Sequence, residues 1–167
     1  MKCYLGLTCN VGSYARVVQE LIGLNIPKED LTELLYSPLD ILIQFTELES
    51  LDAFVEKWFN PIVQMNAEEA LITETLTFIV ISAGPSLTEV PFAYLFLNTP
   101  PQYFATIQDS LLTTTGVLSA DTVFGPYDVI CPVQASDRTD LDLLIARIQR
   151  SIPSLKVSMM AVVKLRS

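Results

Sequence analysis

Histidine is absent from this 167-residue sequence. That absence excludes Ser-His and Cys-His nucleophiles, histidine-ligated haem and histidine-based zinc sites. The three cysteines, Cys3, Cys9 and Cys131, lack C-x-x-C spacing, and their odd number argues against a disulfide framework. A large share of enzyme chemistry is thereby removed. We predict a non-enzymatic protein with no catalytic residues, no metal and no cofactor.

Long apolar runs and basic patches are also missing. The longest apolar runs, such as Phe92 to Leu97, span about six residues, whereas a membrane-spanning helix needs about 20. Ten basic residues stand against 19 acidic ones, giving a net charge of −9, and no patch suits nucleic-acid phosphates. Residues 1–4 lack a signal-peptide pattern. We expect a cytoplasmic protein that contacts neither membrane nor nucleic acid directly.

Core-forming residues are abundant, since 50% of the chain is hydrophobic and only 17% is charged. Periodicity and turn residues predict the order β-α-β-β-α-β in residues 1–82. Gly, Pro and Ser mark a linker at 83–91, and the same order repeats in 92–167. Strands are predicted at 2–8, 31–36, 40–45, within 71–82, and at 92–97, 117–124, 128–134 and 157–165. The helix after the third strand is expected to begin at a Thr46–Glu49 capping box and to end at Pro61.

A turn found twice indicates that the two halves are copies. Val123-Phe124-Gly125-Pro126-Tyr127-Asp128 joins two apolar strands, and a diverged version stands at Tyr36-Ser37-Pro38-Leu39-Asp40. Pro38 and Asp40 match Pro126 and Asp128 at an offset of 88, and Tyr4 matches Tyr94 at an offset of 90. Matches at nearly one offset indicate internal duplication.

The predicted strands are apolar on both faces, as in Phe92 to Leu97 and Val129 to Cys131. A β-α-β-β-α-β unit covers only one face of its sheet with helices. The other face therefore needs a cover, and the simplest is a second such sheet, from the partner half or from another chain. We expect sheet-to-sheet packing and a homo-oligomer. Pro132 is expected to cause a bulge or an early strand end.

Gly116-Val117, followed by Val123-x-Gly125-x-Tyr127-Asp128, an apolar strand and an acid-capped helix, resembles the effector-binding domain of the leucine-responsive (Lrp/AsnC) regulators. Residues 92–164 cover essentially that whole domain, and the first half is similar in outline. The resemblance implies two tandem ferredoxin-like units of the α+β class that pack as in dimeric α/β barrels. It also implies binding of an amino acid or another small effector near the turn. Members of the family usually carry a helix-turn-helix, and no such segment precedes the first strand here.

The candidate effector-binding residues are Gly125, Pro126, Tyr127 and Asp128, with Asp40 as the equivalent in the first half. Asp128 has the acceptors for an effector ammonium, but an aspartate after a turn also binds neighbouring amides and shapes the hairpin. Tyr127 either lines a pocket or packs at the sheet interface. Arg147 and Arg150 are typical of cations near a helix C-terminus. Residues 113–115 form a threonine loop with no assigned role.

Three functions are compatible with these features. The favoured one is a small-effector binding and oligomerisation module, related to Lrp/AsnC transcriptional regulators and lacking its own DNA-binding domain. The second is an enzyme of the dimeric α/β-barrel type, such as a small monooxygenase or isomerase, which would need a polar pocket. The third is a structural partner that co-assembles with a regulator carrying the helix-turn-helix.

Overall fold

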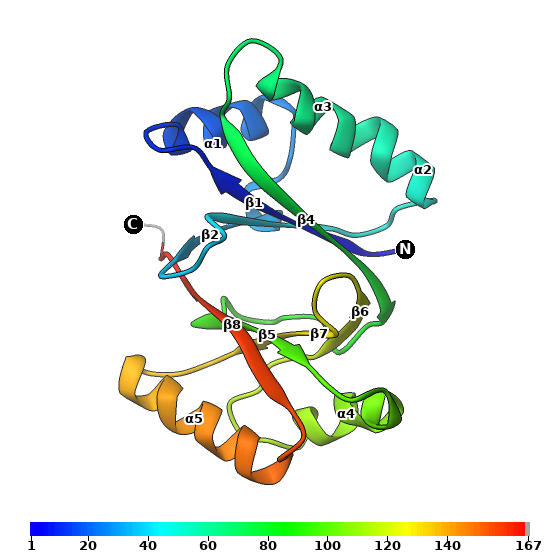
Figure 1. The fold of residues 1–167 in the computed structure, drawn as a ribbon, viewed down its shortest axis with the longest axis vertical. Helices are drawn as coiled ribbons and strands as arrows, with labels where there is room; N and C mark the ends of the chain where they lie inside the picture. Colours follow the sequence, from blue (N-terminus) through cyan, green and yellow to red (C-terminus); the bar gives the residue numbers. More distant parts are fainter. Residues whose placement is uncertain (166–167) are drawn as a thin grey trace. The chain divides into compact units, whose positions relative to one another are not determined.

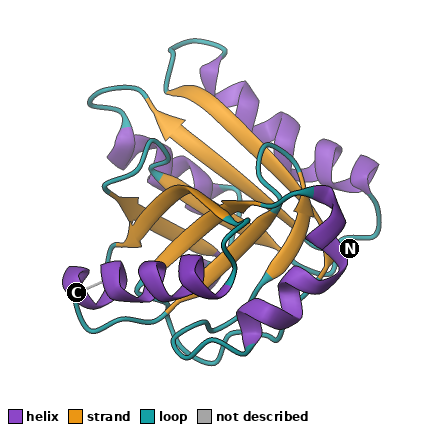
Figure 2. Cartoon of the chain, turned by 60° about the horizontal axis from the view of Figure 1, so that its bottom comes forward, coloured by secondary structure: helices purple, strands orange, loops and turns teal. Residues whose placement is uncertain are grey.

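The computed structural model describes residues 1–165, so residues 166 and 167 of the second predicted half lie outside the described part. The chain divides into two compact units, Met1–Ile79 and a second one from Val80 onward. Both units combine helices with antiparallel strands (Figure 1, Figure 2). Within residues 1–165, no helix has the length and apolar character needed to cross a bilayer.

Unit 1 has a sheet in the order β4-β1-β3-β2, with every neighbouring pair antiparallel. Its helices pack on one face of this sheet (Figure 1). Single turns at Lys28–Asp30 and Gln64–Asn66 are 3₁₀-helical. The main elements are β1 (Cys3–Cys9), α1 (Tyr14–Gly23), β2 (Leu31–Leu35), β3 (Ile41–Phe45), α2 (Leu51–Phe54), α3 (Asn60–Val63) and β4 (Ile72–Ser82).

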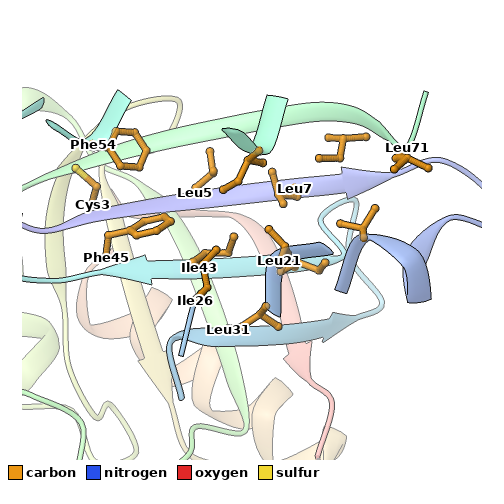
Figure 3. Packing of buried hydrophobic residues seen from close by; sticks show 14 residues of the cluster. Cys3, Leu5, Leu7, Leu21, Ile26, Leu31, Ile43, Phe45, Phe54 and Leu71 are labelled. Carbon is orange, nitrogen blue, oxygen red and sulfur yellow. The ribbon is translucent and has the colours of Figure 1, made fainter. Parts of the chain in front are cut away.

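The core of unit 1 follows from the alternation of apolar residues along β1 and β3. Cys3, Leu5 and Leu7 point to the helical side, because side chains two positions apart share a face of a strand. Figure 3 shows them beside Leu21 of α1 and Phe54 of α2. All five side chains are buried.

Unit 2 has a sheet in the order β8-β5-β7-β6, again antiparallel throughout. Apolar side chains from α4 and α5 join those of β5 and β7 in one buried cluster, so both helices cover the same face (Figure 1). A 3₁₀ turn at Pro101–Tyr103 precedes α4. The elements are β5 (Ala93–Asn98), α4 (Phe104–Leu112), β6 (Asp121–Phe124), β7 (Val129–Val133), α5 (Arg138–Ser151) and β8 (Lys156–Val163).

The second face of each central strand is also buried. Tyr4 of β1 is 2% exposed, and Tyr94 and Phe96 of β5 are 4% and 0% exposed. These residues alternate with the ones that face the helices, as the apolar pattern of the strands requires. The packing of one sheet on another stays a prediction.

The helix that follows β3 does not begin or end where the sequence predicts. Its N-cap is Ser50, whose hydroxyl accepts the N–H of Ala53 (3.1 Å), and the helical path continues through Pro61 to Val63. A π-helical turn, Val55–Phe59, precedes the proline. Such a turn shifts the backbone hydrogen-bond pattern just before the residue that lacks an N–H. The helix therefore passes Pro61 without ending.

The prediction of a bulge at Pro132 is wrong, because β7 pairs with β5 in unbroken register from Val129 to Val133. The Pro132 carbonyl accepts the N–H of Leu118 (3.0 Å), so its nitrogen faces residues 118–120. Those residues form no strand, and β6 is shorter than predicted, beginning at Asp121. No ladder hydrogen bond is therefore lost at the proline.

The segment predicted as a linker is fastened to unit 2. The N–H of Gly84 donates to Oδ1 of the buried Asp121 (2.8 Å), and the Ser119 hydroxyl donates to the Pro85 carbonyl (2.7 Å). The Gln134 amide donates to the carbonyl of Val90 (3.1 Å). Gly84 fits closely, since a Cβ there would lie 2.5 Å from Ser119 Oγ and within 2.8 Å of the Ala120 backbone.

We predict that Gly84→Ala destabilises the protein by about 1–3 kcal/mol, because backbone atoms must move to admit the methyl group. Gly23→Ala is the matched control, since a Cβ at Gly23 meets nothing within 4 Å and alanine favours the helix. Urea unfolding followed by circular dichroism measures both. Equal stability of the two variants would contradict the close fit of this segment.

Candidate effector site

The turn at residues 124–128 joins β6 to β7 and is tied to the central strand β5. The Val123 N–H donates to the Asp128 carbonyl (2.9 Å), and the Asp128 N–H donates to the Leu97 carbonyl (2.9 Å). Gly125 and Pro126 are exposed, whereas Tyr127 and Asp128 are partly buried. The structure therefore brings the four predicted residues of unit 2 together at the end of β5.

Gly125 does not have the left-handed backbone angles for which glycine is favoured in turns. Left-handed φ values occur at the glycines Gly12 and Gly116, not at Gly125. The turn thus does not call for glycine through a left-handed φ at this position. Ser37 occupies the equivalent position of the turn in unit 1, as expected if both turns work without one.

One oxygen of Asp128 is engaged by the protein and the other is not. Oδ2 accepts the Thr99 N–H (3.0 Å) and a longer bond from the Asn98 side-chain amide (3.4 Å). The Ser158 hydroxyl of β8 donates to the Asn98 side-chain oxygen. Oδ1 of Asp128 has no hydrogen-bond partner within residues 1–165. Oδ2 thus holds the turn in place, and Oδ1 can still accept a hydrogen bond.

Asp40 repeats this arrangement in unit 1. Its N–H donates to the Leu7 carbonyl (2.8 Å), its carbonyl accepts the Leu34 N–H (2.9 Å), and its Oδ2 accepts the Cys9 N–H (2.7 Å). These are the same three connections, to equivalent positions, that Asp128 makes. Each unit therefore offers one aspartate at the end of its central strand.

Tyr127 packs against an aromatic ring, in line with its interpretation as a packing residue. The centroids of Tyr127 and Phe96 are 5.7 Å apart at an interplanar angle of 55°. Such tilted contacts add to the free energy gained from burial alone. In unit 1, Leu39 replaces the tyrosine and Gly6 replaces the phenylalanine; a Cβ on Gly6 would lie 2.8 Å from Leu39 Cδ1.

Around Asp40, the structure gathers titratable groups that sequence reasoning missed. The Tyr14 hydroxyl donates to Oε1 of Glu33, and both residues are partly buried. Burial raises the pKa of Tyr14 most, and the hydrogen bond to Glu33 and the charges of Glu33, Cys9 and Asp40 raise it further. Burial and then Asp40 raise the pKa of Cys9 to about 11.

The acidic cluster of Cys9, Tyr14, Glu33 and Asp40 belongs to unit 1 alone. At the matching offsets, unit 2 has residues that do not titrate in place of the first three: Thr99, Phe104 and Thr122. The sequence signal was faint, because the four residues come from β1, α1, β2 and a turn. Only the fold shows that these segments meet.

The three thiols of the described chain have pKa values above the ordinary value for cysteine. Burial raises the pKa of Cys3, and burial followed by the charge of Asp121 raises that of Cys131 to about 12. A thiol nucleophile needs the opposite shift. Within residues 1–165, no three Cys, Asp or Glu side chains come together as metal ligands.

No family model and no curated protein matches the sequence. Solved structures share the fold at low identity. The siroheme decarboxylase NirDL with an iron-uroporphyrin III analogue is 7% identical, with a TM-score of 0.55 over 97% of this chain and 70% of that one. NirDL in another structure is 8% identical, with a TM-score of 0.54 over 97% and 71%. A major regulator of staphylococcal pathogenesis is 10% identical, with a TM-score of 0.52 over 100% of both chains.

We predict that Asp128→Ala lowers the free energy of unfolding by about 1–3 kcal/mol, because the Thr99 N–H loses its acceptor. Asp128→Asn keeps a side-chain oxygen for that N–H and should cost less than Asp128→Ala. Urea unfolding of both variants measures the difference. If alanine and asparagine are equally tolerated, the carboxylate does not hold the turn.

We further predict that stability falls as pH rises from 9 to 11, in part through Cys9. Its pKa is raised from 9.0 to about 11 in the folded protein, so the unfolded chain loses the thiol proton first. Below pH 9 the protonated Cys9 thiol costs the folded state nothing. Between pH 9 and about 11 the unfolded chain gains free energy by releasing this proton, so the free energy of unfolding falls. Cys9→Ser, which does not titrate there, should show a shallower decline in thermal stability over the same interval. An identical decline would contradict the raised pKa.

Proposed function

We propose that this chain is a non-enzymatic module that binds a small effector, an amino acid for preference, and that is related to Lrp/AsnC regulators. The observation that carries the proposal is the half-engaged carboxylate of Asp128. Its Oδ2 is anchored to the end of β5, which fixes its position, and Oδ1 has no protein partner within residues 1–165. An ammonium group offers N–H donors and the opposite charge to such an oxygen.

Gly125 and Pro126 form the exposed side of this proposed site, and Tyr127 and Asp128 its partly buried side. In unit 1, Asp40 has the same anchoring, and Glu33 places a second carboxyl group beside Tyr14, whose pKa the charge of Asp40 also raises. We infer that the unit 1 site also takes a cationic group. The extra acidic residue would make the two sites differ in ligand preference.

The relation between the two units is part of the proposal. Equivalent hydrogen bonds at Asp40 and Asp128, and equal strand orders within each unit, support two diverged ferredoxin-like copies. We propose that the module assembles as a homo-oligomer in the cytoplasm. Assembly with a separate helix-turn-helix regulator would then supply the DNA contact that this acidic chain is not suited to make.

Raised thiol pKa values and the absence of histidine support a role without catalysis. The likeness to a protein described as a regulator, over 100% of both chains, fits a regulatory module. At 10% identity it speaks for the fold alone. The effector site therefore rests on the geometry at Asp128.

We predict that one of the common amino acids raises the melting temperature at millimolar concentration, since a ligand that binds only the folded state stabilises it. At a hundred times the Kd the gain is ~2.7 kcal/mol. Asp128→Asn should lose the shift, because the charge facing the ammonium is gone. Asp142→Asn is the matched control, an exposed aspartate of α5 that pairs with Arg138, and should keep it. Absence of any shift across the amino acids would overturn the proposal.

An enzyme acting on a tetrapyrrole is the second candidate, since two structures that share the fold are of a siroheme decarboxylase. One of these contains an iron-uroporphyrin III analogue. Titration of the chain with iron uroporphyrin III, followed by visible absorption, separates the candidates. A saturable spectral change would favour the enzyme, and an unchanged spectrum is expected for an amino-acid sensor.

A further inference from the structure

We propose a second binding site, for a phosphate-bearing small molecule, in an open groove of unit 2 that is distinct from the turn at Asp128. The groove has a volume of about 730 Å³ and lies between the C-terminal end of α4 and the last turns of α5. Its lining joins two features that the effector site does not use, namely the threonine loop at 113–115 and the pair Arg147 and Arg150.

The charge of this groove is opposite to that of the chain. The two arginines are exposed and three positions apart on one helix, so their guanidinium groups repel each other. The lining contains no Asp or Glu, although the sequence has 19 acidic residues and a net charge of −9. Since the lining has no carboxylate to offset the repulsion between the two arginines, a bound anion would reduce it.

Only one of these arginines caps its helix. Arg150 donates from Nε to the Ala146 carbonyl (3.4 Å), as a cation at a helix C-terminus does. Arg147 lies one turn earlier and forms no ion pair or hydrogen bond within residues 1–165. Its guanidinium is therefore available to a ligand in the groove.

The threonine loop is ordered before any ligand arrives. The Val117 N–H donates to the Thr114 carbonyl (3.1 Å), and the Gln134 N–H donates to the Gly116 carbonyl (2.7 Å). Gly116 has a φ of +100° and sits so close to Leu144 of α5 that a Cβ would lie 3.1 Å from Cδ2. The positive φ favours glycine, and a Cβ would also crowd the Leu144 side chain. The loop is held against α5, so binding would cost little ordering of the backbone.

The donors in the groove fit a phosphoryl group better than a carboxylate. Thr113 and Thr114 donate their hydroxyls to the Ser110 carbonyl (2.8 and 3.4 Å) and so cap α4. The hydroxyls of Ser110, Thr115 and Ser151 have no hydrogen-bond partner within residues 1–165. Three hydroxyls and two guanidinium groups offer more hydrogen bonds than the two oxygens of one carboxylate can accept in good geometry. The several oxygens of a phosphoryl group can accept them.

Inorganic pyrophosphate is the probe for this site. Isothermal titration at low ionic strength should detect its binding to the wild-type chain. The double variant Arg147→Gln/Arg150→Gln should bind about tenfold more weakly or worse, because two charge-assisted contacts are lost. Arg147→Gln alone should also weaken binding, and since Arg147 makes no hydrogen bond or ion pair within the described residues, its loss should disturb folding little.

Arg138→Gln is the matched control, an exposed arginine of the same helix that is paired with Asp142 and lies outside the groove. It should bind pyrophosphate like the wild type, and so should Asp128→Asn, because the amino-acid site is separate from this one. No heat of binding at millimolar pyrophosphate would overturn the proposal. Equal affinity of the Arg147/Arg150 and Arg138 variants would do so too. Citrate binding as tightly as pyrophosphate would overturn the assignment to phosphate.

Discussion

In each unit, an aspartate that follows the β-hairpin turn connects the hairpin to the end of the central strand. Asp40 and Asp128 each donate a backbone N–H to a carbonyl of that strand and accept, through Oδ2, the N–H of the residue two positions further along the chain. The bonds join segments about 30 residues apart, so they fix where the turn lies on the sheet. The position of any ligand group that meets the free oxygen depends on this connection.

Next to the aspartates, the two units fill equivalent space with side chains of different size. In unit 1, Gly6 on the central strand leaves room for Leu39, and in unit 2 two rings, Phe96 and Tyr127, fill the equivalent space. Unit 1 thus pairs glycine with leucine, and unit 2 pairs two aromatic residues. The packing beside the aspartates therefore differs between the units while the aspartate connections are the same, so Leu39 can stand where unit 2 has Tyr127.

The order of elements could be predicted from the sequence, because period-two apolar strands and turn residues are local signals. Features that depend on distant segments could not. The helix passes Pro61 because a π-helical turn precedes it, and Pro132 fits inside β7 because its nitrogen faces residues that form no strand. The turn residues at 125–128 were identifiable by their motif. Tyr14 and Glu33 were not, because only the packing of α1 beside β2 brings them near Asp40.

The two proposed sites differ in the sign of their charge. The carboxyl groups of Asp40 and Glu33 and the free oxygen of Asp128 would favour a cationic group, whereas Arg147 and Arg150 stand in a lining without acidic residues. In a chain of net charge −9, long-range attraction brings cations toward the whole molecule and opposes anions. An anion reaches the arginines only if local hydrogen bonds outweigh that repulsion. Affinity in the groove should therefore come from direct contacts, and the ordered loop at 113–116 is what keeps those contacts in place.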